Sequence, residues 1–359
     1  MYKYSHGGNA VFEQGNESII DLSANINPLG ISENVASAII GDIPNINRYP
    51  DNFSTLLREK TAAFEGVNPG WIFFGNGASD IIFRLPRAVG ASKVMIPAPT
   101  FADYERSAKS YGAEVCRHTM YKKDGFTLDS GFVKAAQAEK PKMVYICNPN
   151  NPTGKATETK LIKELLDYCK KIGAWVVIDE CFMDFAEQSR IYTSKPFLGE
   201  YSNLVILKAF TKMFALPGVR LGYALCSNEA LIENLYFHGA DWAVSNLAQA
   251  AGIAAIDGAE SFIKQTVEYV ANARSVIEKE LACLGYTVFE SSANYVFFQS
   301  PYPFDLHEAL NQKGIRIRSC GNYHGLDRTY YRAAVSTQQN NEQLLTVLKQ
   351  INHANSATL

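Results

Sequence analysis

The sequence predicts an α/β protein with a large domain, in which helices cover both faces of a mostly parallel sheet, and a smaller α+β domain. Between about residues 70 and 226, short apolar runs alternate with polar segments of helix length, the pattern of βαβ units. After residue 240 the sequence becomes rich in Ala and helical before further apolar runs appear. The length of 359 residues is enough for two domains.

Six apolar runs predict the strands of the large domain, and several are apolar throughout, as expected for strands covered on both faces. They are residues 71–75, 93–97, 143–147, 175–179, 204–208 and 222–226. Residues 158–173 have the 3.6-residue period of an amphipathic helix. In the small domain we expect a helical stretch with Gly252 and Gly258 as interruptions, then short strands and helices. Those segments are 245–285, 286–299, 307–314, 315–319, 330–336 and a closing helix.

Composition and charge argue against several classes of protein. The net charge of -2, from 34 basic and 36 acidic side chains, offers no electrostatic surface for nucleic acid or anionic lipid. No run approaches the roughly 18 apolar residues of a membrane span, and the first residues do not resemble a secretory signal, so we expect a cytoplasmic protein. The seven cysteines are scattered without a C-x-x-C pair, so we expect reduced thiols and no metal site.

Two polar residues lie where predicted parallel strands end. The loop CNPNNPTG (147–154) follows a strand, and its Asn-Pro and Pro-Thr-Gly steps predict a turn that presents Asn151. Asp179 ends the strand 175–179 directly after apolar residues. Open α/β sheets bind ligands at the carboxyl ends of their strands, which favours a ligand site here. The alternative for Asp179 is a helix cap or a structural ion pair.

A lysine just beyond the strand 204–208 is the third candidate. Lys212 is preceded by the hydroxyl of Thr211 and followed eight residues later by Arg220. Lys208 lies in the same segment and competes with it, since isolated lysines are mostly solvated surface residues.

The segment GNGASD (75–80) predicts a phosphate-binding turn. Gly75 and Gly77 allow a tight turn, after which the amides of Ala78 and Ser79 open a helix at which a phosphate can bind. The segment lacks the third glycine of G-x-G-x-x-G, so a dinucleotide is a poor fit. A phosphate cradle, a lysine amine, a carboxylate and an asparagine together point to pyridoxal 5'-phosphate.

Each candidate has a defined role toward that cofactor. Lys212 supplies the amine that attacks the aldehyde, and Asp179 keeps the pyridine nitrogen protonated so that the ring can accept electrons. Asn151 donates a hydrogen bond to the ring oxygen, and Phe101 stacks on one face of the ring. The phosphate is expected to contact Gly77, Ala78, Ser79, Thr211 and Arg220.

These segments, in this order, carry a family resemblance. GNGASD, PTF, NNPTG, DE, TK and PGVRLGY resemble the motifs of fold type I pyridoxal-phosphate enzymes of the aspartate aminotransferase class. Within that class, HGGN (6–9), SANINPLG (23–30), RYPD (48–51), ANY (293–295), IRIRSCGNYHGLD (315–327) and YYRAAV (330–335) are similar to the L-threonine O-3-phosphate decarboxylases, relatives of the histidinol-phosphate aminotransferases.

The resemblance implies further site residues and a homodimer. Arg332 would bind the substrate α-carboxylate together with Asn151, and Tyr49 would cross to the cofactor phosphate of the neighbouring subunit. His6, Asn25 and Arg318 would line a pocket for the substrate phosphate. Phe182 departs from the usual pattern, in which a tyrosine contacts the ring oxygen, and this departure favours the decarboxylases. The implied domains are an arm over residues 1–30 that packs with the small domain, a large domain over 31–240 and a small domain over 241–359.

The expected reaction, by resemblance, is decarboxylation of L-threonine O-3-phosphate to (R)-1-amino-2-propanol O-2-phosphate in cobalamin biosynthesis. The first alternative is a histidinol-phosphate aminotransferase or related class I/II aminotransferase, which would use the same cofactor residues. A second is decarboxylation of L-serine O-phosphate, since one methyl group is worth only about 1–3 kcal/mol of discrimination. A pyridoxal-phosphate sensor without turnover is disfavoured by the presence of Lys212, Asp179 and Arg332.

Overall fold

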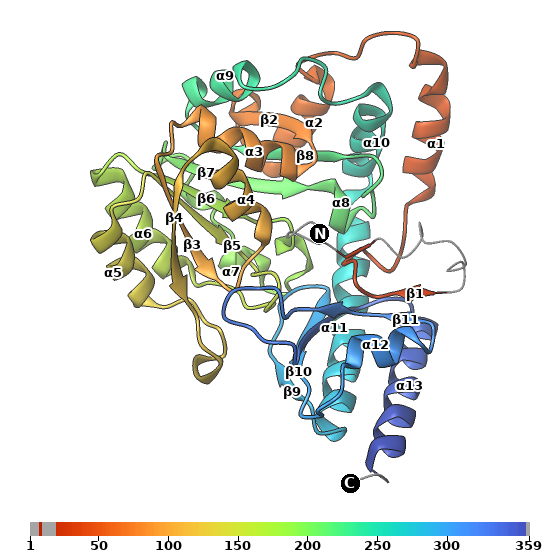
Figure 1. Ribbon diagram of the computed structural model, residues 1–359. Helices are drawn as coiled ribbons and strands as arrows, with labels where there is room; N and C mark the ends of the chain where they lie inside the picture. Colours follow the sequence, from red (N-terminus) through yellow and green to blue (C-terminus); the bar gives the residue numbers. More distant parts are fainter. Residues whose placement is uncertain (1–6, 9–18, 357–359) are drawn as a thin grey trace.

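A seven-stranded sheet forms the centre of the large domain in the computed structural model, which describes residues 7–8 and 19–356 (Figure 1). The strand order is β2-β8-β7-β6-β5-β3-β4; β8 pairs antiparallel with both β2 and β7, and the other neighbouring pairs are parallel. The strands are β2 (Ile72–Asn76), β3 (Lys93–Ala98), β4 (Glu114–Thr119), β5 (Met143–Cys147), β6 (Trp175–Asp179), β7 (Leu204–Ala209) and β8 (Leu221–Leu225).

The six strands predicted for this domain are confirmed, whereas β4 was missed. In β4 no residue is fully buried, and the sequence EVCRHT contains little apolar material. The strand lies at the edge of the sheet and pairs only with β3. The strand β4 is therefore held in the sheet by backbone hydrogen bonds to β3, and it lacks the apolar run that would have predicted it from the sequence.

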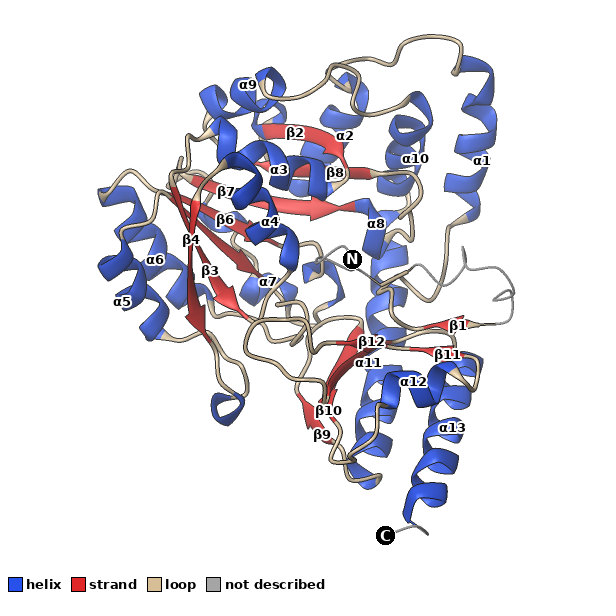
Figure 2. Ribbon diagram, in the orientation of Figure 1, coloured by secondary structure: helices blue, strands red, loops and turns tan. Residues whose placement is uncertain are grey.

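Helices cover both faces of the sheet, as predicted (Figure 2). Successive residues of β6 contribute to different cores: Val176 and Ile178 belong to the cluster beneath α5 and α6, and Val177 to the cluster beneath α3 and α4. The helices up to residue 257 are α1 (Glu33–Asp42), α2 (Thr55–Glu65), α3 (Ala78–Ala88), α4 (Ala102–Tyr111), α5 (Ser130–Glu139), α6 (Thr159–Lys171), α7 (Ser189–Tyr192), α8 (Phe210–Met213), α9 (Glu229–Phe237) and α10 (Asn246–Asp257).

The small domain contains a four-stranded antiparallel sheet in the order β12-β13-β10-β9 and has a hydrophobic core of its own. The arm contributes β1, which pairs in parallel with β11 beside this sheet. The elements are β1 (Ile20–Asp21), α11 (Ala259–Cys283), β9 (Thr287–Phe289), β10 (Tyr295–Gln299), α12 (Leu306–Asn311), β11 (Ile315–Arg316), β12 (Arg318–Ser319), β13 (Tyr330–Ala334) and α13 (Gln338–Ser356). The domain boundaries at residues 30 and 240 remain a prediction. Helix α10 follows the second of these boundaries, yet it packs against α1 and α2, which precede it.

One of the two predicted helix interruptions is wrong. Gly258 separates α10 from α11, as expected. Gly252 instead lies inside α10, where a Cβ atom would come within 2.6 Å of Leu221 and 2.9 Å of Leu57. Glycine at this position allows close packing of α10 on the sheet rather than a break in the helix.

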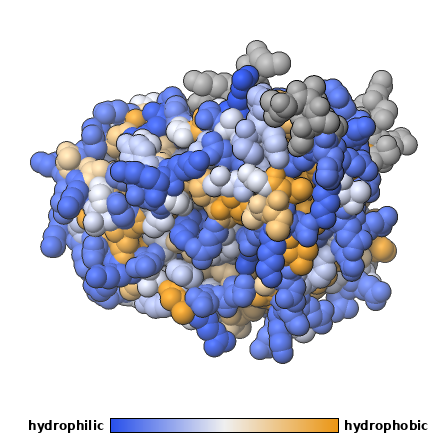
Figure 3. Space-filling view, turned by 90° about the horizontal axis from the view of Figure 1, so that it is seen from below, coloured by the Kyte–Doolittle hydropathy of each residue, from blue (hydrophilic) through white to orange (hydrophobic). Residues whose placement is uncertain are grey.

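The described part of the chain contains neither a candidate membrane span nor a candidate metal cluster. Within residues 7–8 and 19–356, no helix is both long and apolar enough to cross a membrane. The same residues contain no cluster of His, Cys, Asp and Glu side chains that could hold a metal ion. The face of the molecule in Figure 3 is mostly hydrophilic, with smaller hydrophobic areas between the polar side chains.

Candidate active site

A cavity of about 230 Å³ opens at the carboxyl ends of the central strands. Cys147, Asp179 and Ala209 end β5, β6 and β7 and line it, as the general rule for open α/β sheets leads one to expect. The arm and the small domain complete its wall. Predicted site residues that line the cavity are Asn25, Ala78, Ser79, Phe101, Asn151, Asp179, Thr211, Lys212, Arg220, Arg318 and Arg332.

Asp179 is buried at the bottom of this cavity with both carboxylate oxygens engaged. The hydroxyl of Tyr104 donates a hydrogen bond to Oδ2 at 2.6 Å, and the amide of Cys181 donates to Oδ1 at 3.0 Å. The Tyr104 ring stacks on Tyr145 and meets the edge of Phe101. Asp179 is therefore a strand-end carboxylate in a fixed orientation, and among the described residues it neither caps a helix nor forms an ion pair.

Lys212 faces the cavity from α8, and its amine is chemically accessible. Burial, together with the positive charges of Arg332 and Arg220, lowers the pKa of Lys212 to about 8. Its Nζ atom lies 5.8 Å from the centroid of the Phe182 ring. An amine with this pKa is substantially neutral near pH 8, which is the form that attacks an aldehyde.

The competing lysine, Lys208, is occupied elsewhere. Its Nζ atom lies 2.7 Å from Asp184 Oδ1 and 3.2 Å from Glu65 Oε1, and all but about a twentieth of the residue is buried. Glu65 also accepts hydrogen bonds from Lys195 and Tyr223. Lys208 thus belongs to a buried ionic network, and Lys212 is the lysine available to a ligand.

The start of α3 forms the cradle expected from GNGASD. Gly77 is the N-terminal cap with φ of 77°, and no side chain caps the first amides of the helix. A Cβ atom at position 77 would lie 2.6 Å from Nη2 of Arg220, and one at Gly222 would lie 2.3 Å from the amide nitrogen of Ala78. The two glycines therefore allow the guanidinium and the uncapped amides of Ala78 and Ser79 to converge, a site suited to a phosphate.

Arg332 is a buried guanidinium held by the arm and by the loop after β5. Its Nη1 atom donates to Asn151 Oδ1 at 2.5 Å, and Nη2 donates to the carbonyl of Ser23 at 2.6 Å. The Nε atom of Arg332 and Oδ1 of Asn25 are buried without a hydrogen-bond partner among the described residues. Unpaired buried polar atoms are costly, so both atoms are candidates for contact with a bound ligand.

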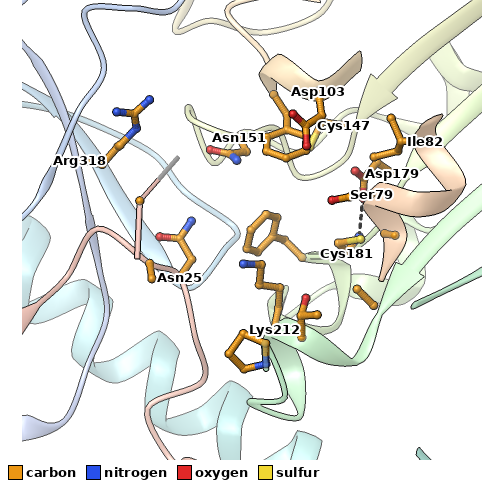
Figure 4. A pocket seen from close by; sticks show the side chains of 18 of the residues that line it. Asn25, Ser79, Ile82, Asp103, Cys147, Asn151, Asp179, Cys181, Lys212 and Arg318 are labelled. Atoms are coloured by element: carbon orange, nitrogen blue, oxygen red, sulfur yellow. Dashed lines mark hydrogen bonds between the residues drawn. The ribbon is translucent and has the colours of Figure 1, made fainter. Parts of the chain in front are cut away.

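Arg318 lies at the opposite end of the cavity from Ser79 and Asp179 (Figure 4). Its guanidinium packs 5.6 Å from the ring centroid of Tyr323 and donates to Asn322 Oδ1 at 2.9 Å. Figure 4 shows Lys212 and Asn25 between these two ends. The cavity consequently has one anion-binding group at each end and an amine in the middle.

Two predicted site residues lie apart from the cavity or outside the described residues. Tyr49 is 80% exposed and stacks on Trp242 on the outside of the chain, so any contact it makes with a cofactor must be in another subunit. His6 lies outside the described residues, and its role remains a prediction.

Several residues around the cavity were not identified from the sequence. They include Ser23, Tyr104, Cys181 and Tyr323. Tyr104 lies one helical turn after Phe101, within α4, and this spacing is the one local signal that could have indicated it. Ser23 acts through its main-chain carbonyl, which no side-chain pattern reveals.

The geometry fits pyridoxal 5'-phosphate. An uncapped helix start beside a guanidinium suits its phosphate, a buried carboxylate suits its pyridine nitrogen, and Lys212 suits its aldehyde. The aromatic ring of Phe101, at the start of α4, lines the same cavity. No residue of this set points to a competing cofactor.

Comparison with known proteins gives the same assignment. The chain is 32% identical to threonine-phosphate decarboxylase from Salmonella typhimurium, over 98% of this chain and 97% of the relative. It is 33% identical to histidinol-phosphate aminotransferase from Bacillus subtilis subsp. natto, over 94% and 93%. The crystal structure of histidinol-phosphate aminotransferase from Clostridium acetobutylicum superimposes with a TM-score of 0.86 at 28% identity, covering 93% of this chain and 99% of that one. Residues 17–348 match the family model "Aminotransferase class I and II", and the chain belongs to that family of enzymes.

Proposed function

We propose that this enzyme uses pyridoxal 5'-phosphate to decarboxylate L-threonine O-3-phosphate. The observation that carries the proposal is a single cavity with Lys212 in the middle, a phosphate cradle at one end and Arg318 at the other. Arg332 adds a further positive group beside Lys212. Beyond the cofactor cradle, the cavity has three further groups: Lys212, Arg332 and Arg318. They match, in that order, the amine, the carboxylate and the phosphate of the substrate.

The cofactor, when bound, supplies an electron sink for the electron pair released at the substrate Cα. Asp179 holds the proton of the pyridine nitrogen, and Tyr104 fixes the carboxylate that does so. Ser79, Thr211 and Arg220 bind the cofactor phosphate together with the start of α3. Phe101, which lines the same cavity, would cover one face of the ring.

Lys212 is the group that returns a proton to Cα after CO2 has left. With a pKa of about 8, its amine can accept and release a proton near physiological pH, the property that a general acid–base group requires. Lys212 lies between the two ends of the cavity, where the substrate Cα would be bound (Figure 4).

Arg332 binds the α-carboxylate. Its guanidinium is oriented by Asn151 and by the Ser23 carbonyl before any ligand is present, so little side-chain entropy remains to be lost on binding. A bidentate contact between guanidinium and carboxylate would also orient the Cα bonds.

A histidinol-phosphate aminotransferase is the second candidate, and sequence identity to the two kinds of relative is nearly equal. Phe182 favours the decarboxylase. Its ring packs edge-on against Tyr295 and brings no hydroxyl to the cavity beside Lys212, where the aminotransferase pattern has a tyrosine. The motifs of the arm and of the loop after β12 support the same choice. L-Serine O-phosphate remains an alternative substrate, since it differs by one methyl group.

A homodimer with shared sites is part of the proposal. Large exposed apolar side chains gather on residues 40–56 and 237–242, two segments joined by the Tyr49–Trp242 stack and by a hydrogen bond from Asn52 to Asp241. They are Ile40, Ile43, Ile46, Tyr49, Phe53, Leu56, Phe237 and Trp242. Apolar patches of this kind mark protein interfaces. A second copy of the chain placed here would let Tyr49 reach the neighbouring cofactor.

The reaction is tested by supplying the cofactor-loaded enzyme with O-phospho-L-threonine, O-phospho-L-serine, or histidinol phosphate with 2-oxoglutarate. Released CO2 and newly formed glutamate are measured separately. We expect CO2 from O-phospho-L-threonine, and less from the serine compound. Glutamate from histidinol phosphate, without CO2 from either phosphoamino acid, would make the enzyme an aminotransferase.

The shared site is tested by complementation between two inactive chains. A Lys212→Ala chain and a Tyr49→Ala chain, mixed and allowed to exchange subunits, should regain activity because one site of the mixed dimer has both residues. A mixture no more active than its components would contradict the proposal that Tyr49 contacts the cofactor of the neighbouring subunit.

A further inference from the structure

The loop between β12 and β13 connects the substrate end of the cavity to the large domain. Residues 320–327 of this loop contain the segment NYHGLD, which takes no part in holding the cofactor. Tyr323 of the loop lines the cavity, whereas His324 is more than half exposed on the outside. The two residues are neighbours in the chain with different surroundings.

On the cavity side, the loop holds Arg318. Asn322 accepts a hydrogen bond from Nη2 of Arg318 at 2.9 Å, and the Tyr323 ring lies under the guanidinium at 5.6 Å. A displacement of the loop would therefore move the positive group at that end of the cavity.

On the outer side, the loop rests on the large domain. Nε2 of His324 lies 3.3 Å from Oε2 of Glu105 in α4. A Cβ atom placed on Gly325 would be in van der Waals contact with Thr119 at 3.8 Å and Pro99 at 3.9 Å, and Leu326 packs against the hydrophobic cluster on one face of the main sheet. The loop thus spans the two domains.

Glu105 is a permanently charged anchor for this contact. Burial alone would raise the pKa of its carboxyl, but hydrogen bonds and charges from Arg117 and Lys109 lower the pKa to about 2. Lys109 and Arg117 both contact Oε1, which leaves Oε2 to His324. Each oxygen of this carboxylate therefore has a different partner.

We propose that His324 is a positioning residue for the substrate phosphate: its contact with Glu105 holds residues 320–327 in the conformation in which Asn322 and Tyr323 orient Arg318. The inference rests on the proposed function, because it assumes that Arg318 binds the phosphate. His324 acts through the loop and touches neither cofactor nor substrate. Its loss should weaken binding of the phosphate group while leaving the cofactor end unchanged.

The test measures binding of O-phospho-L-threonine to the cofactor-loaded dimer by calorimetry, without reference to turnover. His324→Ala should raise the dissociation constant about three- to fivefold, the effect of losing one partly exposed hydrogen bond. His324→Gln, which keeps a donor of similar reach, should restore most of the affinity. Binding of L-threonine, which lacks the phosphate, and retention of the cofactor should be unaffected by either substitution.

Lys109→Ala is the matched control, because it removes a different partner of Glu105, on α4 itself, and leaves the loop intact. We expect wild-type affinity for this variant. An unchanged dissociation constant for His324→Ala, an equal loss in Lys109→Ala, or an equal loss for L-threonine would each overturn the inference.

The positioning role of His324 and the proposed reaction can fail independently of each other. If the wild type releases no CO2 but binds O-phospho-L-threonine with the expected dependence on His324, the reaction is wrong and the positioning role stands. If the wild type decarboxylates O-phospho-L-threonine and His324→Ala binds it normally, the reaction stands and the positioning role is wrong. A wild type that binds no phosphorylated ligand contradicts both.

Discussion

The hydroxyl of Tyr104 lies 2.6 Å from Oδ2 of Asp179, and neither residue is more than a twentieth exposed. Burial and the neighbouring Asp179 carboxylate raise the pKa of Tyr104 well above its usual value, so the phenol remains a hydrogen-bond donor. The contact joins α4 to the end of β6. It also connects the carboxylate proposed for the pyridine nitrogen with the helix that begins beside Phe101.

Tyr104→Phe should weaken binding of pyridoxal phosphate by about one to two orders of magnitude. A hydrogen bond to a charged group contributes about 1.5–3 kcal/mol, and each 1.4 kcal/mol corresponds to a factor of about ten. Equilibrium dialysis of the cofactor measures the change. Tyr145→Phe is the control, because the Tyr145 hydroxyl donates to the Ile82 carbonyl rather than to Asp179. An equal loss of cofactor affinity in the two variants would show that the hydrogen bond from Tyr104 to Asp179 does not contribute to cofactor binding.

Lys212→Ala should abolish covalent attachment of the cofactor, whereas Lys208→Met should lower the stability of the protein. Borohydride reduction should fix the cofactor covalently on the Lys208→Met protein and fail on Lys212→Ala, as read by mass spectrometry of the peptide spanning both positions. Lys208→Met should instead lower the free energy of unfolding by about 3–5 kcal/mol, because it leaves Glu65 with one ion-pair partner fewer in the core. Cofactor trapped on Lys212→Ala would reverse the assignment of the two lysines.

Attachment of the cofactor to the cofactor-free protein should accelerate as pH rises through about 8 and level off above it. Burial and the charges of Arg332 and Arg220 favour the neutral amine, so the pKa of Lys212 lies below that of an ordinary lysine, and the ammonium predominates only below about pH 8. Arg332→Met removes one positive neighbour and should move the midpoint to higher pH. Stopped-flow absorbance measures the rates. A midpoint that moves to lower pH in Arg332→Met would contradict this electrostatic coupling.

Gly222→Ala should weaken cofactor binding, whereas Gly218→Ala should not. A Cβ atom at position 222 would lie 2.3 Å from the amide nitrogen of Ala78 and would push the start of α3 away from Arg220. At Gly218, in the same PGVRLGY segment, a Cβ atom meets nothing within 4 Å. Thermal unfolding with and without cofactor would compare the pair. Equal cofactor-dependent stabilisation in both variants would rule out the close approach as a requirement.

The sequence by itself determined those features that depend on local patterns. Apolar runs placed the buried strands to within a residue or two, because strands covered on both faces need apolar side chains throughout. The start of α3 at Ala78 followed from the glycines before it. Asp179 was recognised because it ends an apolar strand, and Asn151 because the Asn-Pro and Pro-Thr-Gly steps predict a turn after another strand. The edge strand β4 escaped this reasoning because its side chains are mostly solvent-facing.

The tertiary structure decided which of these residues meet. Arg332 and Asn151 are 181 positions apart, and their contact depends on how β13 packs against the loop after β5. The choice between Lys208 and Lys212 depends on which face of the sheet holds Glu65 and Asp184. The contacts of Tyr104 with Asp179 and of His324 with Glu105 likewise join distant segments. Local sequence patterns indicate which residues are buried, but they do not specify the order of the strands or the packing of the loops. The side chains of the site are brought together by that strand order and loop packing.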